Sequence, residues 1–129
     1  MARKATGRPT DLELEILKVL WERGPSTVSL VQEVMELRRP IAYTTVLKTL
    51  QVMTEKRLVV PDKSQRAYVY RARESHSTVA RRLVGDLLNR LLDGSTPQLV
   101  LHALAHRKAK PEELDEIRRL LDDAEGAQR

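Results

Sequence analysis

The sequence predicts a mainly α-helical fold with one small β-hairpin, in which a winged helix-turn-helix domain precedes a C-terminal helical region. Three observations predict this class. Short segments with helical periodicity are separated by turns that contain proline or glycine. Two β-rich runs flank a polar turn between residues 58 and 70. The C-terminal third then carries leucine-rich stripes at helical spacing.

We expect four segments along the chain. They are a disordered basic arm over residues 1–9, the winged-helix domain over 10–73, a helical dimerisation domain over 74–123 and a flexible tail over 124–129. A chain of 129 residues with 41% hydrophobic and 32% charged residues is too short for a large enzyme with an enclosed pocket. It contains no cysteine, which excludes disulfides and cysteine-based metal sites.

Charge is unevenly distributed along the chain. Residues 1–73 contain 14 lysines and arginines against 8 acidic residues, a net charge of +6, whereas residues 74–129 contain 9 against 10, a net charge of −1. The basic half is therefore expected to contact an anionic partner. No apolar run is long enough for a membrane span or a signal peptide, so we expect no membrane insertion and a cytoplasmic protein.

The first two helices are marked by their ends. Thr10 and Glu13 have the spacing of a capping box, so the first helix is expected to begin there and to stop at Gly24-Pro25. Ser26-Thr27 offers the next N-cap, and the second helix is expected to end within residues 38–40. Two short helices and a close third one are typical of a helix-turn-helix.

Residues 40–60 are expected to form the third helix and, directly after it, a strand. The rest of the chain is expected to be organised around this segment. Val46, Leu50 and Met53 form one apolar face, and the opposite side is polar. Its hydroxyl, ammonium and amide groups are of the kind that reach base edges and phosphates from a major groove. Taken alone, this pattern also fits a solvated amphipathic helix. The candidate DNA-binding residues on this helix are Thr44, Thr45, Lys48, Thr49 and Gln51.

A hairpin is expected after the third helix. Residues 58–60 and 67–70 are rich in β-forming residues and flank a polar turn. Lys63 and Arg66 near the tip of this wing are expected to contact DNA phosphates. Tyr68 and Tyr70 share one face of the second strand, and we expect both in the core rather than stacked on bases.

The sequence resembles the penicillinase and methicillin-resistance repressors of the BlaI/MecI type from Thr10 to about Asp123. The resemblance rests on T-D-L-E-L-E-I-L-K-V-L-W, on A-Y-T-T-V-L-K-T-L-Q-V-M-T-E-K-R-L-V and on R-A-Y-V-Y. It implies a homodimeric repressor that binds palindromic operators in double-stranded DNA, with the helix from Tyr43 to Glu55 as recognition helix. Two positions depart from the family pattern. Ala42 stands where relatives often have a capping side chain, and Arg57 stands where they often have glycine.

The C-terminal third is expected to form three helices with more leucine than one small bundle can cover. Gly94 is expected to end the first, Thr96-Pro97 to begin the second and Lys110-Pro111 the third. A second copy of the chain is the expected partner for these apolar faces. The candidate interface residues are Leu83, Val84, Leu87, Leu88, Leu91, Leu114, Ile117 and Leu121.

The resemblance also implies a route of release from DNA. Relatives that are inactivated by proteolysis are cut at an Asn-Phe bond after a Leu-Val-Leu run, and here residues 99–101 keep the run but His102-Ala103 follows it. We expect cleavage around Leu101, His102 and Ala103 by a membrane-anchored zinc metallopeptidase sensor. Because alanine replaces a large aromatic residue, that sensor would need a different specificity.

Catalytic and metal-binding motifs are sparse, so we expect no enzyme and no cofactor. His102 and His106 have the spacing of two metal ligands on one helix face, but no third ligand is identifiable, and two surface histidines explain them as well. The expected function is a dimeric DNA-binding repressor. The alternative is a winged-helix module that binds an acidic protein partner and has no sequence-specific DNA role.

Overall fold

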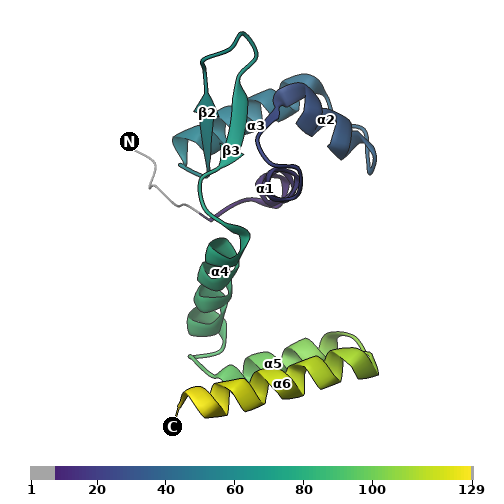
Figure 1. Ribbon diagram of the computed structural model, residues 1–129, viewed down its shortest axis with the longest axis vertical. Coiled ribbons are helices and arrows are strands. Elements are labelled where there is room, and N and C mark those ends of the chain that lie inside the picture. The colour runs from purple at the N-terminus through teal and green to yellow at the C-terminus, as the bar shows by residue number, and fades with distance from the viewer. Residues whose placement is uncertain (1–7, 129) are drawn as a thin grey trace. The chain divides into compact units, whose positions relative to one another are not determined.

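The structure is a computed structural model that describes residues 8–128 and divides into two compact units, Met1–Leu83 and Val84–Arg129 (Figure 1). The predicted fold class is confirmed, with a winged helix-turn-helix followed by C-terminal helices. No helix within residues 8–128 is both long and apolar enough to cross a membrane. The elements are α1 (Asp11–Arg23), β1 (Ser26–Thr27), α2 (Val28–Glu36), α3 (Tyr43–Glu55), β2 (Val59–Asp62), β3 (Val69–Ala72), α4 (His76–Leu91), α5 (Thr96–His106) and α6 (Pro111–Ala127).

The start of α1 is fixed by a capping box. The Glu13 backbone N–H donates to Thr10 Oγ1 at 3.2 Å, and the Thr10 N–H donates to Glu13 Oε1 at 2.9 Å. Most of the arm expected over residues 1–9 lies outside the described residues. Its last two residues are described: Pro9 is buried, and the Arg8 carbonyl accepts a hydrogen bond from Lys56 Nζ at 3.1 Å. The chain is therefore anchored before α1 begins.

The wing belongs to a three-stranded antiparallel sheet with the order β1-β3-β2. The sequence predicted the hairpin of β2 and β3, but β1 was not foreseen. Ser26 and Thr27 pair with Tyr70 and Val69 of β3. Both β1 residues are hydrophilic, and their pairing partner lies more than forty positions away. The sequence around β1 therefore contains no strand signal.

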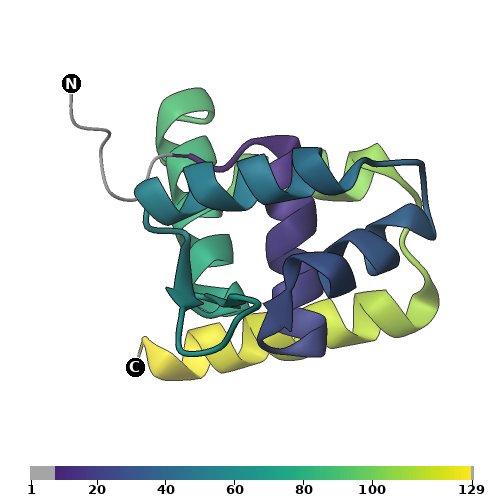
Figure 2. The ribbon, with the colours of Figure 1, turned by 90° about the horizontal axis from the view of Figure 1, so that it is seen from above.

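The core of the first unit lies between the three helices and the sheet, and Figure 2 shows α3 crossing over α1. The buried face of α3, formed by Val46, Leu50 and Met53, is the one that its periodicity predicted. The side chains that are almost fully enclosed are Ile16, Leu17, Val31, Val46, Leu50, Met53 and Val59. This core holds α3 with its opposite face exposed.

The first turns of α4 also belong to the winged-helix unit, which extends to Leu83 and so beyond residue 73. Trp21 Nε1 donates to the Glu74 carbonyl at 2.9 Å, and the Trp21 ring packs edge-on against His76. Arg82 binds the Glu74 carboxylate with two hydrogen bonds of 2.8 and 2.9 Å. Val79 is buried. These contacts attach the first turns of α4 to the winged-helix unit.

The second unit contains the remainder of α4 together with α5 and α6. The N-cap of α5 is Ser95 rather than the expected Thr96, because the Ser95 hydroxyl accepts the Gln98 N–H at 3.3 Å. Glu113 caps the start of α6 by accepting the Lys110 N–H at 3.0 Å. The last helix continues to Ala127, where a tail was expected from residue 124; nothing in Asp122 to Ala127 stops a helix as proline would.

None of the described residues from 84 to 128 is buried. No two of the helices α4, α5 and α6 pack as closely as α1 and α2 or α2 and α3 do. The large apolar side chains that stay exposed here are Val84, Leu87, Leu91, Val100, Leu101, Leu104, Leu120 and Leu121. Within a single chain, the second unit thus has no enclosed core among its described residues.

Candidate nucleic-acid interface

The outer face of α3 is polar and open. Val46, Leu50 and Met53 point into the core, which places Thr44, Lys48 and Gln51 on the opposite, exposed side. Thr45 is exposed at one edge of this face. The α3 side chains expected to contact DNA therefore share one surface, apart from Thr49.

Thr49 lies at the margin of that surface. It is half-buried, and its hydroxyl donates to the Thr45 carbonyl oxygen at 2.7 Å. With Thr45 and Lys48 it borders a shallow depression of about 320 Å³ beside Thr10 at the start of α1. Because its hydroxyl proton is already engaged, Thr49 can only accept a further hydrogen bond.

The two ends of α3 are held differently. Its N-cap, Ala42, makes no side-chain hydrogen bond, which agrees with the missing capping side chain noted in the sequence. Beyond the other end, Arg57 has φ +61°, in the left-handed region where glycine is most favourable. Lys56, the C-cap, forms a 2.6 Å ion pair with the buried carboxylate of Glu13. The start of α3 is loosely capped, and its end is firmly attached to α1.

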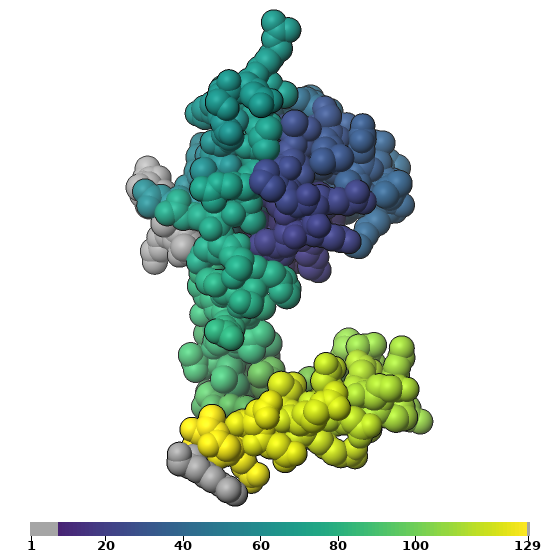
Figure 3. Space-filling view, viewed as in Figure 1, coloured from purple at the N-terminus to yellow at the C-terminus, as the bar shows by residue number. Residues whose placement is uncertain are grey.

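The tip of the wing projects from the first unit, as the teal atoms at the top of Figure 3 show. Lys63 and Arg66 are exposed on it. The Ser64 N–H donates to Asp62 at 2.9 Å, and this backbone hydrogen bond holds the pKa of the Asp62 carboxyl below its ordinary value. The expectation for Tyr68 was wrong: its side chain is 44% exposed, because β3 begins only at Val69, whereas Tyr70 is buried.

The cations of this surface are available to a ligand. Lys48, Lys63 and Arg66 form no ion pair with any carboxylate of the described residues. Lys63 Nζ instead lies 5.7 Å from the centre of the Tyr68 ring, a cation–π distance. Elsewhere in the chain, Arg39 and Lys56 are paired with glutamates. The cations expected to contact DNA from α3 and the wing are thus free of carboxylate partners among the described residues.

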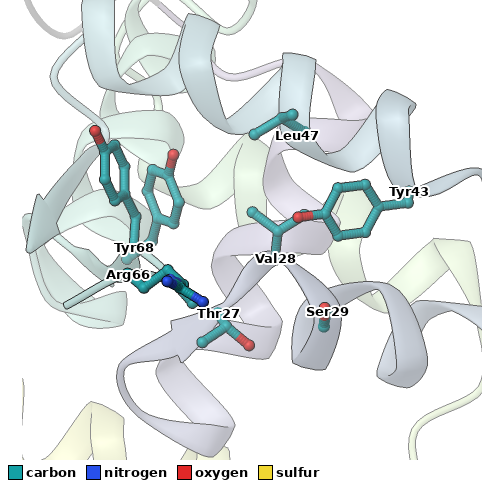
Figure 4. A pocket seen from close by; sticks show the side chains of 9 residues that line it. Thr27, Val28, Ser29, Tyr43, Leu47, Arg66 and Tyr68 are labelled. Atoms are coloured by element: carbon teal, nitrogen blue, oxygen red, sulfur yellow. The ribbon is translucent and has the colours of Figure 1, made fainter. Parts of the chain in front are cut away.

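A pocket of about 200 Å³ lies between the start of α2, the start of α3 and the wing, and we call it the wing pocket (Figure 4). Its polar lining consists of Thr27, Ser29, Tyr43, Arg66, Tyr68 and Tyr70. Burial raises the pKa of the Tyr70 hydroxyl above its ordinary value, and the neighbouring Tyr68 and Tyr43 hydroxyls raise it further. The Tyr70 hydroxyl is therefore a protonated donor at neutral pH.

Sequence reasoning did not find this pocket. Only Arg66 among its polar residues was a candidate, since the others are separated by up to 43 positions and meet through the fold alone. One weak signal was present. Tyr43 falls at the edge of the apolar face of α3, where a fully buried side chain is not required, and it is 45% exposed.

The candidate dimer residues lie on α4 and α6. Leu87, Leu91 and Leu121 are exposed, as is Val84, while Leu83, Leu88, Leu114 and Ile117 are half-buried. Within the second unit, α4 and α5 line an open groove of about 700 Å³, which includes His102 and His106. Among the residues that the structure describes, no three side chains come together as metal ligands would.

Comparison with known proteins shows the family of this chain. Residues 9–123 match the family described as penicillinase repressor. The chain is 34% identical over 116 residues to the transcriptional regulator BlaI of Mycobacterium tuberculosis, covering 89% of this chain and 83% of that protein. It is 26% identical over 118 residues to the penicillinase repressor of Bacillus licheniformis, covering 88% of this chain and 89% of that protein. The chain therefore belongs to the penicillinase repressor family of transcriptional regulators.

Proposed function

We propose that this protein is a sequence-specific DNA-binding repressor that binds an inverted-repeat operator as a homodimer. The observation that carries the proposal is the set of unpaired cations on α3 and the wing, next to exposed hydroxyl and amide groups. In a winged helix of this kind, α3 enters the major groove. Thr44, Lys48 and Gln51 would then face base edges, while the wing cations Lys63 and Arg66 approach phosphates.

Dimerisation through the second unit is supported by its exposed apolar surface. Leu91 is 68% exposed and Leu121 59% exposed, whereas the buried apolar side chains of the described residues all belong to the first unit. A groove lined by Leu87, Leu91 and Leu99 is open to receive a helix. A second copy offers the matching apolar helix, and an isologous contact would bury both faces at once. A dimer of this kind would present two winged helices to the two halves of an inverted repeat.

Release by cleavage in α5 is the remaining part of the proposal. Leu101, His102 and Ala103 are all exposed and lie inside a helix that has no buried residue. A helix with so few buried contacts opens locally at low cost, which gives a protease access. A cut there separates α6 from the rest of the second unit. A membrane-anchored zinc metallopeptidase sensor would make it, and mass spectrometry of the protein from induced cells would reveal the two fragments.

A protein-interaction module with an acidic partner is the alternative function. The same unpaired cations would serve it, but such a partner would not require the hydroxyl and amide groups of α3. Selection of genomic DNA fragments by the purified protein separates the two functions. A shared inverted repeat among the bound fragments supports the repressor, whereas fragments with no common sequence would support the interaction module.

Two substitutions test the assignment of α3 and the wing. Lys48→Ala is expected to lower affinity for the operator and to reduce its preference over unrelated DNA, because Lys48 faces the groove. Arg66→Ala is expected to weaken binding to all sequences alike and to reduce the salt slope by about one unit. Titrations at several salt concentrations measure both effects, with Lys18→Ala on α1 as control. Unchanged binding in both variants would contradict the assignment.

A further inference from the structure

The wing pocket has the chemistry of an anion site. Each of its polar side chains can donate a hydrogen bond: the guanidinium of Arg66 and the hydroxyls of Thr27, Ser29, Tyr43, Tyr68 and Tyr70. None of the described residues that line it is acidic. An arginine without a carboxylate partner is the side chain best suited to hold a phosphate, since its planar fork donates two parallel hydrogen bonds.

The donors reach the pocket from different sides. Figure 4 shows the Arg66 guanidinium beside Thr27, while the Tyr43 ring extends from α3 with its hydroxyl end towards Val28. Val28 and Leu47 supply an apolar floor, which lowers the local polarity and strengthens hydrogen bonds made above it. Lys63, over the Tyr68 ring, adds a second positive charge beside the pocket. Arg66 and Thr27 on one side and Tyr43 on the other offer donors for one tetrahedral anion.

The position of the pocket indicates where this anion comes from. Tyr43 is the first residue of α3, and Arg66 lies on the wing. If α3 occupies the major groove and the wing approaches the flanking backbone, a DNA strand passes between them, over the wing pocket. An enclosed site would suit a free ligand, whereas this open one suits a phosphate that remains part of a chain.

We propose that the wing pocket binds one backbone phosphodiester in each half of the operator, with Arg66 and Tyr43 as its principal donors. This inference rests on the proposed DNA-binding function. Because Tyr43 begins α3, the contact sets how far the helix sits along the groove, and Tyr43 is therefore a positioning residue. Phosphate contacts fix register without reading sequence, so the contact supports the base contacts of Thr44 and Lys48 indirectly.

Operator duplexes that each carry one neutral methylphosphonate linkage test the proposal with the full-length protein. For the wild type, a methylphosphonate at one position in each half-site is expected to lower the affinity about tenfold. This factor corresponds to the loss of one charge-assisted hydrogen bond. For Arg66→Ala, the same linkage is expected to cost less than about twofold, because the partner is already missing. Tyr43→Phe, which keeps the ring and hence the packing, is expected to give an intermediate loss at that same position.

Lys63→Ala is the matched control, since it removes a wing cation that does not line the pocket. Its overall affinity should fall, but the tenfold loss at the one linkage should persist. Equal losses in wild type and Arg66→Ala at every linkage would overturn the phosphate assignment. If the wild type binds DNA without sequence preference, the proposed repressor function is contradicted. If it binds no DNA at all, both the repressor function and the phosphate assignment are overturned.

Inorganic phosphate distinguishes a DNA phosphate from a free anion. At constant ionic strength, titration of the free protein is expected to give no saturable change in the NMR signals of Tyr43 and Arg66 below about 10 mM, because an isolated phosphate loses the support of the duplex. Saturation at micromolar phosphate would assign the pocket to a free anionic ligand and would overturn the proposal.

Discussion

The two units use similar amphipathic helices in different ways. In the first unit, Leu50 of α3 is fully buried by α1, α2 and the sheet. In the second unit, Leu91 of α4 stands on a comparable apolar stripe and is 68% exposed. The periodicity of a stripe therefore shows which face will be covered, but not whether the same chain covers it. The first unit closes its own core, and the second is suited to close one with another copy.

The largest expected effect comes from removing the second unit. A fragment ending at Leu83 should fold, because it keeps the contacts of Trp21 with residues 74–76 and the buried Val79. It should be monomeric and bind a full operator about 10²–10⁴-fold more weakly, since the half-sites are no longer linked. Sedimentation and DNA titration measure these properties. A dimeric fragment with full affinity would place the interface in the first unit.

Truncating one leucine in each unit sharpens the comparison. Leu50→Ala should lower the free energy of unfolding by about 2–5 kcal/mol at any protein concentration, because it leaves a cavity in a closed core. Leu91→Ala, the matched change in the second unit, should act through association, so its effect should depend on protein concentration. Denaturant titrations at several concentrations distinguish them. A concentration-independent loss for Leu91→Ala would show that the second unit is self-contained.

A smaller effect is expected at Arg57. Its backbone has φ +61°, a conformation that costs an L-residue free energy but suits glycine. Arg57→Gly should therefore stabilise the first unit by about 0.5–1 kcal/mol. Arg57→Ala is the control and should not stabilise the first unit, because the Cβ atom of alanine keeps the steric conflict at this positive φ. Thermal unfolding of the fragment ending at Leu83 reports this unit alone, and equal stability of the two variants would contradict the backbone explanation.

The smallest effect concerns the junction of the sheet and α4. The Arg82 guanidinium, by its hydrogen bonds, holds the pKa of the Glu74 carboxyl below its ordinary value of 4.5. A lowered carboxyl pKa stabilises the folded state above that ordinary value, and the contribution disappears as the pH falls through the folded pKa. Because these side chains remain 30% and 26% exposed, it should stay below about 1 kcal/mol.

Glu74→Gln tests this assignment. The variant should be slightly less stable than the wild type at pH 7 and equally stable well below pH 4.5. Urea titrations of the fragment ending at Leu83, at pH 7 and in acid, would measure the difference. A difference that is the same at both pH values would show that the ion pair does not cause it.

Elements with local signals were predicted well from the sequence. The capping box of Thr10 and Glu13, the Thr27 cap and the buried face of α3 all depend on residues within a few positions of one another. The second strand was placed two residues early, which put Tyr68 in the core. Strand ends depend on pairing partners, and here β3 is paired on both sides, by β1 and by β2. That information lies outside the strand itself.

The candidate site was foreseen only in part for the same reason. The polar face of α3 follows from helical spacing, so Thr44, Lys48 and Gln51 could be named from the sequence. The wing pocket could not be predicted from the sequence, because Ser29, Tyr43 and Arg66 belong to three segments that tertiary packing brings together. The open groove of α4 and α5 was likewise indicated only as an excess of leucine.

The carboxylate of Glu13 has a consequence for how the domain opens. Its Oε1 accepts both the Thr10 N–H and Lys56 Nζ, so it joins the first turn of α1 to the C-cap of α3 across 43 positions of the chain. If either partner leaves, a buried charge loses part of its compensation, at a cost of about 3–5 kcal/mol when the pair is broken. The two helix ends are therefore expected to exchange their amide hydrogens in one cooperative event, so that α3 cannot fray at its end while α1 stays intact.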